Sequence, residues 1–273
     1  IMIMCGMSAA FSALFGTPLA AAVFSMEVVS VGIMHYSALV PCVIASLTAH
    51  GIASACGIAP EIFPIASIPA FTPKNALIIG IFAVLCALVS ILFCTTLHNA
   101  ERLYKRFFKN PYVRALAGGL IVIGLTMLVG NQTYNGTGMN IITGCMEGKT
   151  VFPLAFLLKM VFTAATLGAG YKGGEIVPTL FIGSTFGTFF ASAFGCSIPL
   201  CAAVGMGAVF CGVTNSPITS LMICFELFGF DGMPYFLIAI ALSYMLSGYY
   251  GLYSSQKIIY SKYKTEYINR KTH

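Results

Sequence analysis

Long apolar stretches, separated by short polar breaks, dominate the pattern of hydrophobic and polar positions. A helix needs roughly 20 apolar residues to cross the hydrocarbon core of a bilayer. Five stretches approach or reach that length, and each is predicted to form a membrane-spanning helix; they cover residues 36–56, 76–97, 113–130, 152–167 and 233–248.

Shorter apolar pieces, interrupted by Gly, Pro and polar residues, lie between the long ones. They cover residues 1–15, 18–34, 137–145, 178–195, 199–213 and 217–230. Irregular backbone is tolerated at membrane depth only where it is buried in protein or lines a cavity. Paired broken helices are typical of a transporter whose site lies near the bilayer midplane. The pattern therefore predicts an all-α membrane protein with broken helices.

One interrupted pattern occurs twice, at a constant offset of 199 residues. The matching segments are 6–11 (GMSAAF) with 205–210 (GMGAVF), 17–19 (TPL) with 216–218 (SPI), and Glu27 with Glu226. Helix, proline break, helix and glutamate thus recur in the same order. A repeat of this kind in a membrane chain predicts two structurally related halves that are inverted relative to each other. Chance similarity between two apolar stretches is the alternative.

Composition and charge support a membrane location. The chain is 58% hydrophobic and 8% charged, with a mean hydropathy of +0.92, whereas soluble domains carry about 25% charged residues. Ten of the fourteen basic residues fall in two clusters, within 102–114 and 257–271, that flank apolar stretches. The positive-inside rule places both on the cytoplasmic side, and this explanation leaves no need for a nucleic-acid partner.

Enzymatic and metal-binding patterns are absent from the sequence. None of the ten cysteines forms a C-x-x-C pair, and no phosphate-binding, hydrolase or metal motif occurs. We therefore expect no metal, no cofactor and no catalytic residues. The chain opens inside an apolar run at Ile1, so we expect that an N-terminal part precedes it.

The segment 172–183 (KGGEIVPTLFIG) is the strongest candidate for an ion site. Two glycines permit close approach of the backbone, and Pro178 suits the first turn of a helix. A helix N-terminus offers free N–H groups and a partial positive charge to an anion. Glu175 could carry protons there, because a carboxylate at membrane depth is a functional hypothesis by default. The alternative is a capped loop, with Glu175, at the water interface.

Three further residues have two readings each. Glu27 and Glu226 each lie nine residues after a helix-starting proline; they are proton-route candidates, or they end their helices and pair locally. Tyr253 precedes the C-terminal basic cluster. Its hydroxyl could donate to an anion, or its ring could belong to the interfacial aromatic belt.

Four segments resemble the CLC family of voltage-gated chloride channels and anion/proton antiporters. They are 16–27 (GTPLAAAVFSME), 173–178 (GGEIVP), 215–227 (NSPITSLMICFEL) and 251–254 (GLYS). The resemblance implies a CLC-type inverted-repeat helical bundle with broken helices, present here in part. It also implies a transmembrane domain over 1–263 and a cytoplasmic tail over 264–273.

The resemblance further implies residue roles and partners. Anion binding is expected from Gly174, Glu175, Ile176, Val177 and Tyr253. A homodimer is expected, with an interface formed by the helices around 18–34, 36–56, 217–230 and 233–248.

Several positions depart from the family pattern. Two anion loops, one with the gating glutamate, are expected upstream of Ile1. Ile176 stands where Phe is usual, and Val28 stands where chloride antiporters carry a second proton glutamate. The segments 172–175 (KGGE) and 226–229 (ELFG) look like the fluoride-exporting branch, although that branch often has Thr at Val177.

The expected function is transport of chloride or fluoride, with or without proton exchange, by a multi-pass protein of the cell membrane. The expected partners are the anion, protons and the lipid bilayer. Two alternatives stay open: a truncated, non-conducting CLC fragment, and an unrelated secondary transporter with inverted repeats.

Overall fold

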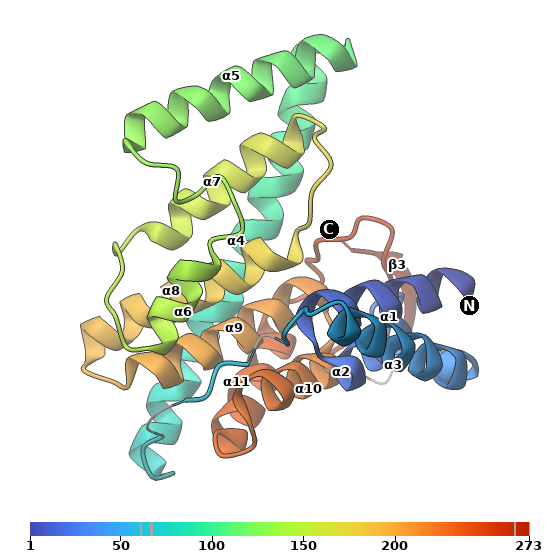
Figure 1. Cartoon of the computed structure of the whole chain (residues 1–273), viewed down its shortest axis with the longest axis vertical. Helices are drawn as coiled ribbons and strands as arrows, with labels where there is room; N and C mark the ends of the chain where they lie inside the picture. Colours follow the sequence, from blue (N-terminus) through green and yellow to red (C-terminus); the bar gives the residue numbers. More distant parts are fainter. Residues whose placement is uncertain (61, 66–67, 265, 273) are drawn as a thin grey trace.

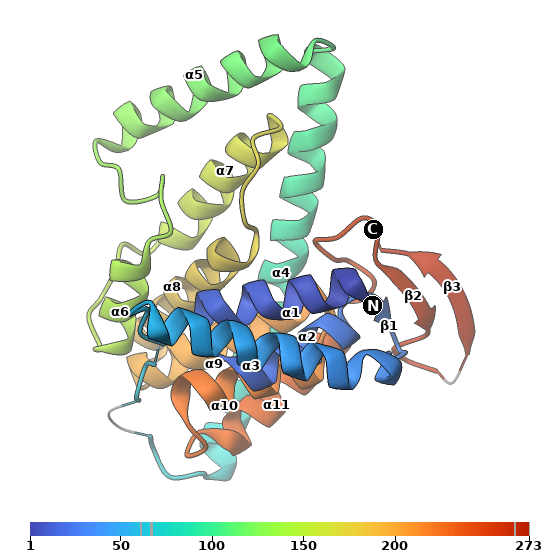
Figure 2. The same ribbon diagram turned by 45° about the vertical axis from the view of Figure 1, so that its right-hand side comes forward.

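The computed structural model describes residues 1–60, 62–65, 68–264 and 266–272 (Figures 1 and 2). The described part is an all-helical bundle with one small sheet. Its helices are α1 (Met2–Phe15), α2 (Pro18–Glu27), a 3₁₀ turn (Tyr36–Ala38), α3 (Leu39–Ala55), α4 (Pro73–Phe107), α5 (Pro111–Val129), α6 (Met139–Met146), α7 (Ala155–Gly168), α8 (Ile176–Phe194), α9 (Ile198–Thr214), α10 (Pro217–Phe228) and α11 (Met233–Leu246).

Four helical segments of the described chain are long and apolar enough to cross a membrane: Tyr36–Ala55, Pro73–Phe107, Pro111–Val129 and Ile176–Phe194. Three of them confirm predicted spans. The stretches predicted at 152–167 and 233–248 instead form helices of 14 residues, α7 and α11. The interrupted piece predicted at 178–195 instead belongs to the continuous helix α8 (Ile176–Phe194), because Pro178 lies in its first turn and breaks no hydrogen bond there.

The centre of the bundle is the pair α8 and α9 (Figure 1). Every residue of α9 from Leu200 to Thr214 is buried, which is the reason for its apolar character on all sides. A Cβ atom on Gly183 would lie 2.5 Å from the carbonyl oxygen of Gly205. One on Gly187 would lie 2.1 Å from that of Cys201. Because these glycines have no side chain, the backbones of α8 and α9 pack in direct contact at both positions.

The duplicated pattern forms two helix pairs with the same break. Gly16 in the left-handed region ends α1 and Pro18 begins α2; Asn215 in the left-handed region ends α9 and Pro217 begins α10. The C-terminal end of α2 lies at the N-terminal end of α10, and the C-terminal end of α10 lies at the N-terminal end of α2. The second helices of the two pairs are therefore antiparallel, as the prediction of inverted halves requires.

A three-stranded sheet closes the C-terminal side of the bundle (Figure 2). Strand β1 (Ser30–Val31) pairs in parallel with β2 (Lys257–Tyr260), which pairs antiparallel with β3 (Tyr267–Lys271). The sequence pattern did not predict these strands. The predicted tail 264–273 contains β3, and residues 265 and 273 of that tail lie outside the described residues.

Candidate anion site at the N-terminus of α8

The N-terminus of α8 opens onto a cavity of about 460 Å³. Glu175 is the N-cap residue, and its side chain makes no capping hydrogen bond to the described first turn. Gly174, Glu175, Ile176, Val177 and Tyr253 all line this cavity. The rest of the lining is Gly173 with the apolar side chains Met7, Ala10, Phe11, Leu14, Phe15 and Phe24 of α1 and α2. The structure thus brings together all five residues expected to bind the anion.

A second cavity of about 540 Å³ lies on the other side of Glu175 and Tyr253, which line both. Its other charged or titratable lining residues are His98, Glu101, Lys105, Arg114, Tyr171 and Lys172. One cavity is mainly apolar and the other is polar with an excess of cations. Glu175 and Tyr253 therefore stand between a basic vestibule and an apolar chamber.

The first of the two basic clusters reaches this vestibule, because Lys105 and Arg114 are among its lining residues. Arg102 and Lys105, at the C-terminal end of α4, line a smaller neighbouring cavity together with Ser254 and Thr272. The end of α4 and the C-terminal segment therefore meet beside the vestibule, although they are distant in sequence.

Burial changes the chemistry of the two residues between the cavities. Desolvation raises the pKa of Glu175 above its usual value, and the neighbouring carboxylate of Glu101 adds to that shift. Desolvation also raises the pKa of the Tyr253 phenol well above its usual value of 10. Tyr253 therefore stays a neutral hydroxyl donor at physiological pH, and Glu175 gains a proton more easily than an exposed glutamate.

Backbone contacts position Tyr253. The Leu252 N–H donates to Val213 O at 2.9 Å, and the Thr272 hydroxyl donates to Tyr253 O at 2.8 Å. A ring nitrogen of His98 lies 3.2 Å from Leu252 O. Sequence reasoning missed His98 and Thr272. The one available signal was the position of His98 at the end of an apolar stretch, next to the first basic cluster.

Glu27 and Glu226 lie elsewhere, at the N-termini of each other's helices. The carboxylate of Glu27 accepts hydrogen bonds from the N–H groups of Ile218 (3.1 Å) and Thr219 (2.8 Å) and from the Thr219 hydroxyl (2.6 Å). The carboxylate of Glu226 accepts from the N–H groups of Leu19 (3.0 Å) and Ala20 (2.8 Å). Each glutamate ends its own helix, as one of the two readings expected, but its partners are in the opposite half of the repeat and not local. Neither residue lines the two cavities.

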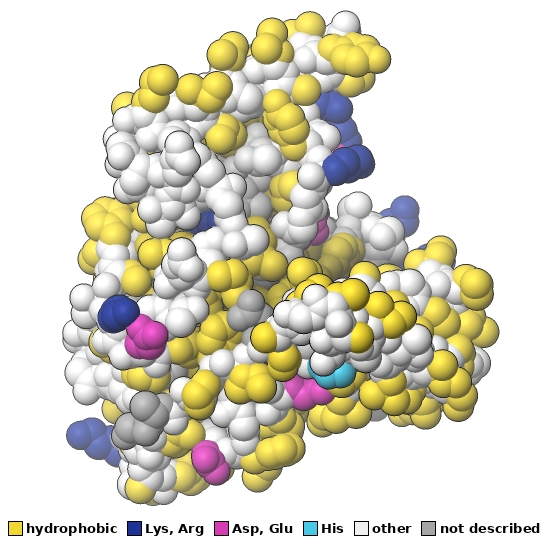
Figure 3. Space-filling view, viewed as in Figure 1, with side chains coloured by type: hydrophobic (Ala, Val, Ile, Leu, Met, Phe, Trp, Pro, Cys, Tyr) yellow, Lys and Arg dark blue, Asp and Glu magenta, His cyan; other side chains and the backbone are white. Residues whose placement is uncertain are grey.

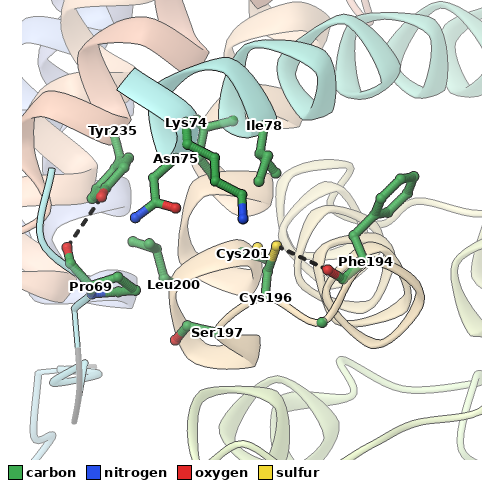
Figure 4. Close-up of a pocket in the computed structure, with 12 residues that line it drawn as sticks. Pro69, Lys74, Asn75, Ile78, Phe194, Cys196, Ser197, Leu200, Cys201 and Tyr235 are labelled. Carbon is green, nitrogen blue, oxygen red and sulfur yellow. Dashed lines mark hydrogen bonds between the residues drawn. The ribbon is translucent and has the colours of Figure 1, made fainter. Parts of the chain in front are cut away.

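A third cavity, of about 240 Å³, lies at the opposite end of α4 (Figure 4). Lys74 extends toward Cys196 and Cys201 across it, whereas Asn75 lies on the side of Pro69 and Tyr235. The Tyr235 hydroxyl donates to Pro69 O at 3.1 Å. None of the predicted site residues lines it. Within the described residues, no group of three or more His, Cys, Asp or Glu side chains is arranged to hold a metal ion.

Comparison with known proteins places this geometry in a family. Residues 1–248 match the family described as "Voltage gated chloride channel". The "Chloride/fluoride channel protein" of Pseudomonas syringae pv. tomato is 33% identical over 269 residues, covering 96% of this chain and 59% of the relative. The ClcB chloride channel of Salmonella typhimurium is 27% identical over 256 residues, covering 89% of this chain and 60% of that protein.

Solved structures agree. The crystal structure of a CLC-type fluoride/proton antiporter superposes with a TM-score of 0.89 at 33% identity, covering 93% of this chain and 64% of the other. A eukaryotic CLC transporter superposes with a TM-score of 0.69 at 19% identity, covering 89% of this chain and 43% of the other, which shows the shared fold. The chain spans about three fifths of the length of the curated relatives named here. This multi-pass membrane protein therefore belongs to the voltage-gated chloride channel (CLC) family, a family of channels and transporters.

Proposed function

We propose that this protein takes part in the transport of chloride or fluoride across a membrane, and that the anion binds at the N-terminus of α8. The carrying observation is that Gly174, Glu175, Ile176, Val177 and Tyr253 line one cavity at a helix N-terminus. The chain spans only part of its relatives' length, so the activity of the complete pathway is part of the proposal.

Backbone amides and one phenol supply the binding chemistry. The N–H groups of the first turn of α8 carry the positive end of the helix dipole. Because Gly174 has no side chain, an anion can approach the backbone closely. The buried Tyr253 hydroxyl adds a neutral donor. These donors hold a dehydrated halide without a fixed positive charge that would trap it.

Glu175 couples the anion to a proton in this proposal. Two negative charges about 4 Å apart repel by about 4 kcal/mol at an effective dielectric constant of ~20. An ionised Glu175 and a halide therefore disfavour each other at the N-terminus of α8, whereas a protonated Glu175 accepts the halide as a neighbour. Burial already raises the pKa of this carboxyl, which brings protonation closer to physiological pH. Glu27 and Glu226 are engaged as helix caps, so we assign them no proton-carrying role.

Fluoride is the first halide to test. The two relatives that are 33% identical are described as a chloride/fluoride channel protein and as a fluoride/proton antiporter. The segment 172–175 (KGGE), which suggested the fluoride branch, lies at the site. Chloride stays a candidate because the same Pseudomonas protein is described for both ions.

A homodimer is the proposed assembly, formed through the face of α2, α3, α10 and α11. This face carries exposed apolar side chains, among them Leu19, Val40, Ile44, Ile218 and Leu237. Figure 3 shows a surface dominated by hydrophobic side chains around α1 and α3, with few charges. Such a face suits lipid or a second copy of the chain.

Halide efflux from liposomes tests the function. The protein is expressed from its gene, including any part encoded upstream of Ile1, and reconstituted into liposomes. Fluoride efflux, chloride efflux and internal pH are then recorded. We expect halide efflux accompanied by opposite proton movement. Glu175→Gln should abolish the proton movement, because an amide cannot carry the proton, and Tyr253→Phe should slow efflux about 10-fold through loss of one donor to the anion.

Two exposed positions provide matched controls. Glu147→Gln and Tyr112→Phe make the same chemical changes away from both cavities. They should leave efflux unchanged. Wild-type efflux and proton movement in both the Glu175 and the Tyr253 variants would overturn the site, and absence of halide efflux from the wild-type protein would overturn the function.

A further inference from the structure

The segment that carries Tyr253 is bound to the C-terminal ends of three helices. The last carbonyl groups of a helix have no partner within that helix, and here residues 252–262 supply the donors. The Gln256 side chain donates to Val28 O at 2.7 Å, just beyond α2, and to Thr214 O at 2.8 Å, at the end of α9. The Leu252 N–H donates to Val213 O at 2.9 Å. One short segment thus donates hydrogen bonds to the C-terminal ends of both α2 and α9.

Lys262 extends the same arrangement to α11. Its ammonium group donates to Tyr244 O at 3.0 Å, to the Ser247 hydroxyl at 3.1 Å and to Asn215 Oδ1 at 2.5 Å, and it lies 4.4 Å from the centre of the Tyr244 ring. Within the described residues, the ion pairs are Lys105 with Glu101 and Lys149 with Glu147. Lys262 is thus held by neutral acceptors at the negative ends of two helix dipoles. Its place in the basic C-terminal cluster gave no hint of this role.

Asn215 connects Lys262 to the Tyr253 segment. It adopts a left-handed conformation at the end of α9, with φ of 58°. Its side-chain amide donates to Tyr250 O and to Gln256 Oε1, both at 3.0 Å. The ammonium of Lys262 fixes the Asn215 carbonyl oxygen, and the Asn215 amide then holds the segment on both sides of Tyr253.

We propose that Lys262 is a positioning residue for Tyr253, which it holds at the anion site through Asn215 and Gln256. Lys262 touches neither cavity at the site, so it acts through this hydrogen-bonded chain. The consequence for anion affinity rests on the function proposed above. The position of Tyr253 itself can be tested without transport.

The charge of Lys262 gives the arrangement a pH dependence. Burial lowers the pKa of Lys262 from 10.5 to about 8. An ammonium has three N–H donors for its three acceptors, whereas an amine has two. The titratable groups that face Lys262 are Cys94 of α4, Cys211 of α9 and Tyr244 of α11. The ammonium predominates below about pH 8, and one bond of the arrangement is lost as the pH rises through that value.

A tryptophan reporter tests the position of Tyr253 directly. The sequence contains no tryptophan, so Tyr253→Trp introduces a single tryptophan, which is excited selectively at wavelengths where tyrosine does not absorb. Lys262→Met should raise the population of the displaced segment about 10-fold, through loss of charge-assisted hydrogen bonds, and should be seen as stronger acrylamide quenching of Trp fluorescence. Lys262→Arg, which retains a charged donor, should restore quenching toward the wild-type level. Lys264→Met, two positions along and exposed, is the matched control and should change nothing.

The pH profile separates positioning from a simple contribution to folding. In the reporter protein with Lys262 intact, quenching should rise between pH 7 and pH 9, on either side of the pKa of about 8. With Lys262→Arg the profile should be flat, because guanidinium stays charged. Wild-type quenching in Lys262→Met, or the same pH profile in the Lys and Arg proteins, would overturn the proposal. The pH comparison remains decisive if Lys262→Met does not fold.

Transport then tests the consequence. Lys262→Met should raise the half-saturating halide concentration while the maximal efflux rate changes less, because a misplaced Tyr253 weakens binding. An unchanged half-saturating concentration would overturn the link to anion affinity. If the wild-type protein moves no halide, the proposed function fails, and the fluorescence results still decide whether Lys262 positions residue 253.

Discussion

Three helices in this molecule, α2, α8 and α10, begin with a similar first turn, but their N-termini have different partners. Helices α2, α8 and α10 each have a proline within the first three positions, and the other N–H groups of the first turn have no partner inside the helix. The N-termini of α2 and α10 are occupied by the carboxylates of Glu226 and Glu27. The N-terminus of α8 has no such side-chain partner among the described residues and opens onto two cavities.

A helix N-terminus can bind an external anion only where no side chain of the protein occupies its N–H groups. All three N-termini carry the same partial positive charge. Internal carboxylates occupy two of these N-termini. Each carboxylate lies nine residues after the start of its own helix and binds the N-terminus of the equivalent helix in the other half. Of these three helices, α8 is the one left for the anion proposed above, because its N-cap glutamate makes no capping bond.

Removing Glu27 should have the largest effect on stability. Glu27→Ala leaves two backbone N–H groups and the Thr219 hydroxyl without their acceptor in a buried place, which should lower the free energy of unfolding by about 3 kcal/mol. Denaturant titration in detergent measures this, with Glu147→Ala as the exposed control. Equal stability of the two variants would mean that the α10 N-terminus does not depend on its carboxylate.

Halide should stabilise the protein through the free N-terminus of α8. At ten times the dissociation constant, a bound halide adds about 1.4 kcal/mol to the free energy of unfolding. Because burial raises the pKa of Glu175, the carboxyl is protonated below that raised pKa and ionised above it. The halide effect should therefore be larger at acid pH and shrink as the pH rises through the pKa. Thermal melts with and without fluoride measure it, and Glu175→Gln should remove the pH dependence.

Removing Glu226 should cost less than removing Glu27. Glu226 is only half-buried and accepts two hydrogen bonds, both from backbone N–H groups. Glu226→Ala should lower the free energy of unfolding by about 1 kcal/mol, which is typical of a lost helix cap. The same denaturant titration applies. A loss as large as that of Glu27→Ala would show that the two caps are equivalent despite their different burial.

Closing the free N-terminus should give the smallest change in stability and a clear change in binding. Aspartate is a better N-cap than glutamate, so Glu175→Asp should raise the free energy of unfolding by about 0.5 kcal/mol. The capping carboxylate would then occupy the N–H groups proposed for the anion, and the stabilisation by fluoride should disappear. Fluoride stabilisation equal to wild type would place the anion away from the first turn of α8.

Much of the fold could be predicted from the apolar pattern. Spans at 36–56, 76–97 and 113–130 follow from length and hydropathy, since lipid demands a long apolar helix. The repeat of 6–27 at 205–226 predicted two related halves, because identical spacing of proline and glutamate imposes the same break. The lengths of α7 and α11 and the small sheet were not predictable in this way, since their surroundings are other protein segments.

The sequence by itself determined the membrane location, the family resemblance and the set of residues, 174–177 and 253, that meet in one cavity. Tertiary structure alone decided which N-terminus each glutamate occupies, because partners such as Glu27 and Thr219 are distant in sequence and meet only when the inverted halves pack. It also placed Lys262 inside a hydrogen-bonded cap, although in sequence it is one more basic residue of a cytoplasmic flank. The sequence gives the charge of a side chain, but the packing of the helices decides which groups form hydrogen bonds with it.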